Sequence, residues 1–266
     1  MGQIERAARR DAKKKDPSSN ITDMASTASA SVDFSKLRNV QLQPKTLDRN
    51  RVIATSKHSA ANEAYKMLRT RIKQSMQSKN LTTLAISSTM AGQGKTLTAI
   101  NLAFSLARDT TLEIVLVDFD LRHPSIFRTL GINSKLPGLV NYLNHKSSLQ
   151  DLLISPGSER LAILGKSRVF EDSSEILSSP RTQELLAELQ SESSSRIVIF
   201  DLPPLLSTDD CLAFTPWIDA VLLVVAEGKT RRTELAEAYD MLQGINIIGT
   251  VLNQSSSRGE RYAYYY

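Results

Sequence analysis

Cysteine and histidine are scarce in this 266-residue sequence, and their scarcity excludes two kinds of site. Cys211 is the single cysteine, so the chain cannot form an internal disulfide. The three histidines, His58, His123 and His145, stand too far apart in the sequence to suggest a zinc-type ligand cluster. We therefore expect any metal that the chain binds to be held by oxygen ligands.

Long apolar stretches are also lacking. The longest uninterrupted apolar run covers residues 220–226, far short of the roughly 20 residues that a membrane-spanning helix requires. The first residues are polar and charged and show no apolar segment of the kind found in a signal peptide. These features predict a cytoplasmic protein.

Aromatic residues make up 6% of the chain, and no stretch interleaves them with basic residues in the way that stacks nucleic-acid bases. The formal net charge is +5, but the densest basic group lies near the N-terminus, outside the expected domain. We interpret this group as a solvated arm and do not expect nucleic acid as a partner. The group comprises Arg6, Arg9, Arg10, Lys13, Lys14 and Lys15.

Composition divides the chain into three parts. Residues 1–50 are rich in Ser, Ala, Thr, Asp and Lys without a sustained apolar period, which predicts a flexible, basic and polar extension. Residues 51–255 form the predicted globular domain, and residues 256–266 form a tyrosine-rich tail. Apolar residues at helical spacing predict a helix over residues 59–77 that leads into the domain: Tyr65, Leu68, Ile72 and Met76.

Apolar β-rich segments alternate with helical segments through the domain. Most of the β-rich segments are apolar almost throughout, which is typical of strands buried on both faces of a parallel sheet. They cover residues 81–87, 113–118, 161–164, 196–201, 220–226 and 247–253. Helices are predicted over residues 96–108, 138–144, 179–190 and 233–242. This order predicts an α/β, doubly wound fold with a mostly parallel sheet.

A glycine-bearing loop joins the first strand to a helix and has the composition of a phosphate-binding loop. Its backbone N–H groups and the start of the following helix attract an anion. We expect Lys95 to reach the β and γ phosphates and the Thr96 hydroxyl to bind Mg²⁺. Thr89 stands where the usual pattern has its first glycine, and a tight turn without a ligand is the alternative interpretation. The residues expected to bind nucleotide are Ala91, Gly92, Gln93, Gly94, Lys95, Thr96 and Leu97.

Carboxylates follow two of the predicted strands. Asp118 and Asp120 come at the end of one strand, and Asp201 ends another. In an open parallel sheet the ligand lies beyond the carboxyl ends of the strands, so we expect these side chains to meet Lys95 in one crevice. Each aspartate alone is also compatible with an ordinary cap. Three strand ends with suitable groups favour one shared site for metal and nucleotide.

Several motifs together resemble the bacterial tyrosine kinases, or BY-kinases, of capsule and exopolysaccharide synthesis. The sequence is most similar to the form whose cytosolic kinase is a separate chain, and the similarity covers residues 55–266. It implies that residues 51–255 are a P-loop kinase domain. The motifs are a Walker A sequence at 91–96, a family-specific Walker A′ sequence at 116–122, a Walker B sequence at 197–204, supporting stretches at 63–69, 123–125, 137–139 and 175–181, and the tyrosines Tyr262, Tyr264, Tyr265 and Tyr266.

The resemblance implies an autokinase that uses ATP and Mg²⁺. Lys95 and Thr96 would bind the phosphates and the metal, and Asp120 and Asp201 would hold the metal directly or through water. Asp118 resembles the residue that orients or deprotonates the incoming tyrosine, whose phenol is protonated at neutral pH. The catalytic residues implied are thus Lys95, Asp118, Asp120 and Asp201. The terminal tyrosines would be phosphorylated in trans to regulate polysaccharide polymerisation and export.

The roles of two further residues are open to two interpretations each. Arg122 either steadies a phosphate or pairs with a neighbouring carboxylate. Asn253, at the end of the last predicted strand, resembles a residue that contacts adenine in related ATPases, and a turn-forming asparagine is the alternative.

A triplet on the first predicted helix resembles the oligomerisation motif of the family. Glu63, Lys66 and Arg69 fall three residues apart, with lysine in place of the motif's first arginine. The resemblance implies a homo-oligomer, a ring in which each tail enters its neighbour's site, whereas local ion pairs on a solvated face are the alternative. It also implies a membrane-embedded polysaccharide chain-length regulator as activator, which would recruit the chain to the inner face of the plasma membrane, and a tyrosine phosphatase as a further partner.

A nucleotide-switched binding module is the alternative function, in which an ATPase associates with a partner without phosphotransfer. Partitioning and division-site ATPases carry an additional lysine five residues before the catalytic one, where this chain has Met90. Those ATPases also do not need a terminal tyrosine cluster, so the kinase is favoured. A degenerate scaffold is a third interpretation, for which Thr89 is the only indication.

Overall fold

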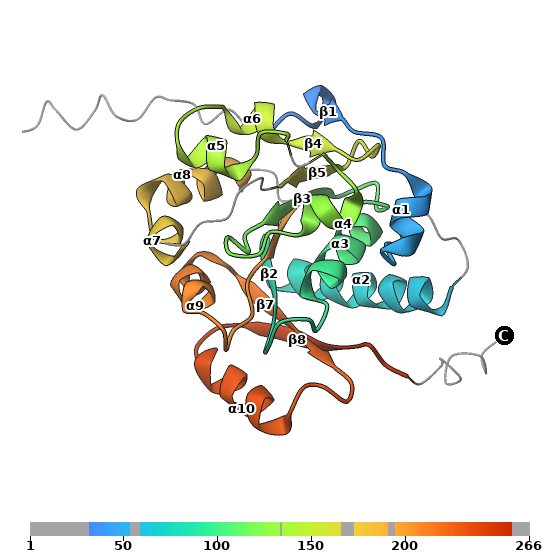
Figure 1. The fold of residues 1–266 in the computed structure, drawn as a ribbon, viewed down its shortest axis with the longest axis vertical. Coiled ribbons are helices and arrows are strands. Elements are labelled where there is room, and N and C mark those ends of the chain that lie inside the picture. The colour runs from blue at the N-terminus through green and yellow to red at the C-terminus, as the bar shows by residue number, and fades with distance from the viewer. Residues whose placement is uncertain (1–31, 54–58, 134, 166–172, 191–194, 257–266) are drawn as a thin grey trace, which may run out of the picture. The chain divides into compact units, whose positions relative to one another are not determined.

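The computed structural model describes residues 32–53, 59–133, 135–165, 173–190 and 195–256, and these residues include one eight-stranded sheet (Figure 1). Its strands are β1 Arg38–Asn39, β2 Thr83–Ser88, β3 Glu113–Asp118, β4 Ile154–Ser155, β5 Leu161–Leu164, β6 Arg196–Asp201, β7 Ala220–Ala226 and β8 Ile247–Asn253. They lie in the order β1-β4-β5-β3-β6-β2-β7-β8, and every neighbouring pair is parallel except β4 and β5. The predicted fold class, a mostly parallel doubly wound sheet, is confirmed.

The central strands send their side chains alternately into two apolar cores, one on each face of the sheet. In β3, Val115 and Val117 belong to one core and Ile114 and Leu116 belong to the other. All four side chains are fully buried. Because both faces are covered, the central strands are apolar at nearly every position, which explains why the sequence shows continuous apolar runs.

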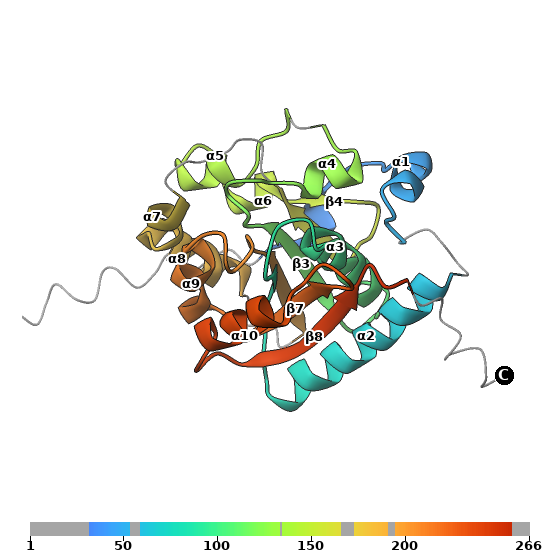
Figure 2. The ribbon, with the colours of Figure 1, turned by 60° about the horizontal axis from the view of Figure 1, so that its bottom comes forward.

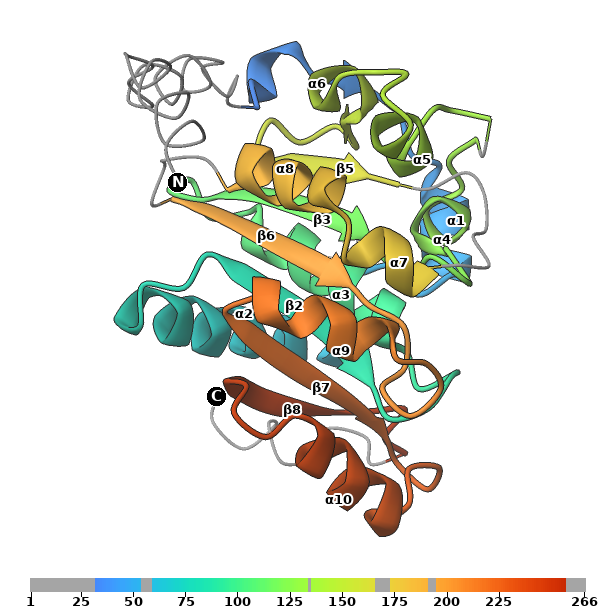
Figure 3. The same ribbon diagram turned by 90° about the vertical axis from the view of Figure 1, so that its left-hand side faces the viewer.

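Helices cover both faces of the sheet. Figure 3 shows α8 and α9 in front of the strands and α3 behind them, and β8 lies between α2 and α10 in Figures 1 and 2. Among the described residues the helices are α1 Pro44–Arg49, α2 Ala60–Ser78, α3 Lys95–Leu106, α4 Ile126–Leu130, α5 Leu139–Leu143, α6 Leu149–Leu152, α7 Ser173–Leu177, α8 Pro180–Leu189, α9 Asp210–Phe214 and α10 Arg232–Met241, with short 3-10 turns at Phe34–Lys36 and Thr215–Trp217. None of them combines the length and apolar character needed to cross a membrane.

Three phenylalanines fix the ends of β3 and β6 against helix α9. Phe119 follows β3, Phe200 lies in β6, and Phe214 ends α9. Their ring centroids lie 4.7–5.4 Å apart at tilted or edge-on angles, which is the arrangement that aromatic pairs prefer. This packing holds the two strand ends rigidly at the point where their aspartates leave the sheet.

Residues 32–50 depart from the prediction of a flexible extension, and the predicted boundary at residue 50 is corrected here. They contain β1, which pairs with β4, and α1, whose Leu47 is only 2% exposed. The Asn50 amide donates to Thr129 O at 2.7 Å and so ties α1 to α4. The apolar residues of this segment are isolated in sequence, so only their long-range contacts order it. The remaining residues of the predicted extension lie outside the described part.

Candidate functional site

The sheet brings three sequence-distant segments to one edge. Strands β3, β6 and β2 are neighbours and run in parallel, so their carboxyl ends meet at the same edge. Asp118 pairs in register with Asp201, and Asp201 pairs with Ile86 of β2. The loop from β2 to α3 therefore begins beside Asp201, and Asp118 lies one strand further along the same edge, as the sequence predicted.

The loop between β2 and α3 has the backbone of an anion cradle. Gly92 and Gly94 adopt left-handed backbone angles, with φ of 77° and 94°. Thr89, which stands in place of a glycine, does not adopt such an angle, so its Cβ causes no backbone strain. Its hydroxyl instead bonds within the loop to the side chain of Gln93, at 2.8 and 3.0 Å. Thr89 thus stabilises the loop through a side-chain contact with another residue of the same loop.

Two residues at the end of β8 hold the carbonyls of the same loop. Asn253 Nδ2 donates to Gln93 O at 2.9 Å, and Gln254 Nε2 donates to Gly92 O at 2.8 Å. Because these carbonyls point toward β8, the peptide N–H groups of the loop are directed away from it. The sequence indicated Asn253 but not Gln254, for which no signal was visible.

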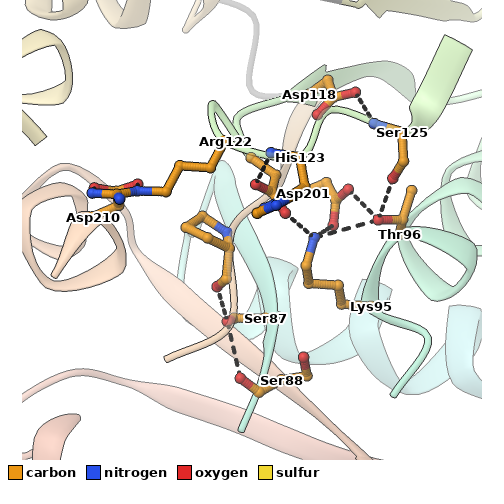
Figure 4. A network of polar contacts seen from close by, with 12 residues as sticks. Ser87, Ser88, Lys95, Thr96, Asp118, Arg122, His123, Ser125, Asp201 and Asp210 are labelled. Atoms are coloured by element: carbon orange, nitrogen blue, oxygen red, sulfur yellow. Dashed lines mark hydrogen bonds and ion pairs between the residues drawn. The ribbon is translucent and has the colours of Figure 1, made fainter. Parts of the chain in front are cut away.

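Lys95 lies at the centre of the charged groups. Its Nζ is 2.8 Å from Asp120 Oδ2 and 3.4 Å from Asp201 Oδ1 (Figure 4). Asp201 also accepts a 2.6 Å hydrogen bond from the Thr96 hydroxyl. Lys95, Asp118, Asp120 and Asp201 are all buried. The structure therefore brings these predicted residues together.

Burial and mutual repulsion shift the acidities of this cluster. Burial, followed by the charge of Asp201, raises the pKa of Asp118 to about 8. Burial also raises the pKa of Asp201. Burial alone would lower the pKa of Lys95, but Asp201 and Asp120 outweigh it and raise that pKa. The lysine is therefore held as a cation among carboxylates.

The two oxygens of Asp118 have different surroundings. Oδ2 accepts the backbone N–H groups of Ser125 and Ile126 at 3.0 and 2.9 Å. Oδ1 is buried and has no hydrogen-bond partner among the described residues. A buried carboxylate oxygen without a donor is costly and often marks a place where another group binds.

Arg122 points away from Lys95 and pairs with Asp210 (Figure 4). Its Nε lies 3.2 Å from Asp210 Oδ2, and Ser173 Oγ donates to the same oxygen at 2.6 Å. The ion-pair interpretation of Arg122 is the one that this structure displays. Asp210 and Ser173 were not identified from the sequence, since they lie on α9 and α7, far from Arg122 along the chain.

The other predicted site residues lie elsewhere or outside the described part. On α2, Lys66 Nζ pairs with Glu63 Oε1 at 2.7 Å, and Arg69 Nη1 donates to Ser105 O at 3.2 Å, near the end of α3. Ala91, Gly92 and Leu97 lie on or beside the loop. The four terminal tyrosines fall outside the described residues.

Within the described residues, no group of three or more His, Cys, Asp or Glu forms a preformed metal site.

Comparisons with known proteins find a nucleotide-binding family and several tyrosine kinases. The family model described as the CobQ/CobB/MinD/ParA nucleotide binding domain matches residues 84–264. The tyrosine-protein kinase YwqD of Bacillus subtilis (strain 168) is 29% identical over 222 residues, which are 82% of this chain and 92% of the relative. The tyrosine-protein kinase CpsD of Streptococcus pneumoniae serotype 4 is 28% identical over 196 residues, which are 73% of this chain and 84% of the relative.

Solved structures of tyrosine kinase domains are also similar to this chain. The kinase domain of VpsO is 30% identical with a TM-score of 0.64, and the match covers 73% of this chain and 96% of that domain. The kinase domain of the Escherichia coli tyrosine kinase ETK has a TM-score of 0.72 at 23% identity, over 84% of this chain and 90% of that domain, which supports the fold. The family match spans the phosphate loop, the three aspartates and Asn253.

Proposed function

The chain belongs to the CobQ/CobB/MinD/ParA nucleotide-binding family and, within it, to the bacterial tyrosine kinases, and on this premise we propose that it phosphorylates its own C-terminal tyrosines in trans. The observation that carries the proposal is the buried cluster in which Lys95 lies 2.8 Å from Asp120 and 3.4 Å from Asp201, at the end of a phosphate-binding loop. The same cluster contains a third carboxylate, Asp118, with one buried oxygen that has no hydrogen-bond partner among the described residues.

ATP is the proposed phosphate donor. The loop N–H groups and the start of α3 provide partial positive charge for its phosphates, and Lys95 adds a full one. Asn253 is the proposed adenine contact, a role supported by its place beside Gln93 of the loop. Arg122 would reach a phosphate only by leaving Asp210, so we assign it a structural role in the state described here.

Magnesium fits the donor set next to the loop. Mg²⁺ prefers oxygen ligands and keeps several waters, so one or two carboxylates suffice to hold it. Thr96 and Asp201 are already joined by a 2.6 Å hydrogen bond, and Asp120 lies across Lys95 from them. These three residues would hold the ion, directly or through water. When bound, it would neutralise charge on the transferring phosphoryl group.

Asp118 is the proposed acceptor of the tyrosine proton. The transfer forms a bond from the phenolic oxygen to the γ phosphorus and breaks the bond from that phosphorus to the bridging oxygen of ADP. The phenolic proton passes to the ionised form of Asp118, whose Oδ1 has no partner among the described residues and whose Oδ2 is fixed by two backbone N–H groups. Most of the acceleration is expected from positioning and charge neutralisation, with Lys95 as the chain's main contribution.

The proposal extends to assembly and partners through the family resemblance. Glu63, Lys66 and Arg69 would contribute to a ring in which each tail enters its neighbour's site. A membrane-embedded polysaccharide chain-length regulator would activate this cytoplasmic chain at the plasma membrane, and a tyrosine phosphatase would reverse the modification. The output would be control of exopolysaccharide or capsule polymerisation and export.

Phosphate mapping tests the proposed function. The full chain is incubated with γ-labelled ATP and Mg²⁺, together with its membrane partner in a parallel reaction. Label is expected on the tail tyrosines and is expected to vanish in Lys95→Met. The matched control is Lys146→Met, which removes an exposed lysine from the loop after α5. Release of free phosphate with an unlabelled tail in both reactions would instead support a nucleotide-switched binding module.

A further inference from the structure

Ser125 precedes helix α4 but does not cap it. A serine at this position normally accepts a hydrogen bond from an N–H of the first helical turn through its side chain. Ser125 makes no such bond. The Asp118 carboxylate accepts the N–H groups of Ser125 and Ile126 instead, at 3.0 and 2.9 Å. The usual structural reason for a serine at a helix start therefore does not apply here.

The Ser125 hydroxyl is directed at the phosphate loop. Its Oγ donates to Thr96 Oγ1 at 3.0 Å (Figure 4). Thr96 in turn donates its proton to Asp201 Oδ2 at 2.6 Å. A hydroxyl has one proton and two lone pairs, and Ser125 occupies one of the two lone pairs of Thr96. The other lone pair accepts a hydrogen bond from Lys95 Nζ at 3.4 Å, so a cation that binds Thr96 would take the place of this long contact.

We propose that Ser125 is a positioning residue that orients the Thr96 hydroxyl toward a bound divalent cation. The hydrogen bond to Asp201 and the one from Ser125 together fix the rotation of the Thr96 hydroxyl about its Cβ–Oγ1 bond. Groups that orient a metal ligand in this way typically change metal affinity 10–100-fold. The inference rests on the proposed function, because it takes Thr96 to be a ligand of nucleotide-bound Mg²⁺.

Ser125 also connects the two halves of the site. Its hydroxyl contacts Thr96 on the phosphate side, and its backbone N–H contacts Asp118, the proposed acceptor of the tyrosine proton. A substitution of the Ser125 side chain removes the hydroxyl contact with Thr96 and keeps the backbone contact with Asp118. The effect of such a substitution is therefore expected in metal binding, while the hydrogen bonds that fix Asp118 remain.

Manganese binding to the full chain with saturating ADP tests this inference without requiring catalysis. Electron paramagnetic resonance measures the free Mn²⁺. Ser125→Ala is expected to weaken Mn²⁺ binding roughly tenfold, and Ser125→Thr, which keeps the hydroxyl, is expected to restore it. Ser125→Cys roughly keeps the side-chain volume but replaces the hydroxyl with a thiol, a weak hydrogen-bond donor. It is expected to weaken Mn²⁺ binding as Ser125→Ala does, and it replaces Ser125→Ala in the experiment if that variant does not fold. The matched control is Ser207→Ala, an exposed serine in the loop after β6.

Wild-type Mn²⁺ affinity in the folded alanine or cysteine variant would overturn the inference. A loss that Ser125→Thr does not restore would also overturn it, since it would indicate packing rather than the hydroxyl. The proposed function fails separately. A wild-type chain that binds Mn²⁺ with ADP but transfers no phosphate to tyrosine, even with its membrane partner, would contradict the kinase, while the metal-binding readout for Ser125 would still decide this inference.

Discussion

Asn253 occupies the space that a side chain on Gly94 would need. A Cβ on Gly94 would lie 2.0 Å from Asn253 Nδ2, and Gly94 itself has a φ of 94°. The end of β8 thus packs directly on the residue that precedes helix α3. A side chain on Gly94 would therefore have to displace Asn253, which couples the end of β8 with the phosphate site.

Gly94→Ala is predicted to abolish ATP binding, measured by calorimetry. The variant has to displace Asn253 and adopt a left-handed backbone, which costs roughly 1–2 kcal/mol for a residue with a side chain. Gly157→Ala is the matched control, because Gly157 has a φ of 88° but no atom within 4 Å of an added Cβ. The control is expected to lose some stability and to keep its ATP affinity. Equal ATP affinity in Gly94→Ala and the wild type would contradict the prediction.

Arg122→Met is predicted to destabilise the domain more than Asp210→Asn. Asp210 is fully buried, whereas the Arg122 side chain is 36% exposed. Removing the arginine leaves a buried carboxylate without its cation, which costs about 2–3 kcal/mol after allowance for the exposure of the pair. Removing the aspartate leaves a guanidinium that can turn to water. Chemical denaturation of both single variants and the double variant measures the difference.

The double variant Arg122→Met/Asp210→Asn serves as the control for that pair. It is expected to be more stable than Arg122→Met alone, because no unpaired buried charge remains. If Arg122→Met is no less stable than Asp210→Asn, the buried Asp210 carboxylate does not depend on Arg122 for its stabilisation.

Asp219 is predicted to make stability depend on pH. Partial burial would raise its pKa, but the N–H groups and hydroxyls of Thr82 and Thr83 outweigh burial and lower it. A lowered pKa in the folded state means that the stabilisation is complete above the unfolded pKa and is lost as the pH falls through the folded value. Asp219→Asn should therefore lower the free energy of unfolding by about 1 kcal/mol at pH 7.

The difference between wild type and Asp219→Asn is expected to shrink as the pH falls below about 4, where the wild-type carboxylate takes up its proton. Denaturant unfolding between pH 3 and pH 7 measures it. A difference that stays constant over this range would show that the charge of Asp219 does not contribute.

The proposed assembly motif gives a prediction for the size of the oligomer. Lys66 makes a single contact with Glu63 at 2.7 Å, and an arginine at this position could bond two atoms at once. Lys66→Arg is therefore predicted to raise the average mass in sedimentation experiments on unphosphorylated protein with Mg²⁺ and ADP, and Lys66→Glu to lower it. Lys79→Glu, at the far end of α2, is the control. Monomer at every concentration in wild type and Lys66→Arg would contradict the ring.

The central sheet could be predicted from the sequence because its strands are buried on both faces. Their residues form apolar runs that need no partner to be recognised, as in β7 Ala220–Ala226. Short elements gave no such signal. The two-residue strands β1 and β4 and the four- or five-residue helices α4, α6 and α9 are too short to show a period. Their positions depend on contacts such as Asn50 with Thr129, across 79 residues of chain.

The candidate site was predictable to a similar extent. Asp118 and Asp201 end two strands, and Lys95 follows the loop after a third. Because parallel strands bring their carboxyl ends together, the sequence was enough to group these residues. The partner of Arg122 was not predictable, because Asp210 is 88 residues away along the chain. Ser125 was visible only as part of a motif, and its bond to Thr96 depends on a turn that the sequence does not reveal.

Phosphate transfer between two variant chains, one without a functional site and one without tail tyrosines, tests the kinase proposal most directly. One chain carries Lys95→Met with an intact tail. The other has an intact site but phenylalanine at all four tail positions: Tyr262, Tyr264, Tyr265 and Tyr266. The chains are mixed with ATP, Mg²⁺ and the membrane partner, and mass spectrometry locates phosphotyrosine. The account predicts phosphate on the tail of the Lys95→Met chain in the mixture and none on that chain alone. ATP hydrolysis with no phosphotyrosine in the mixture would contradict it.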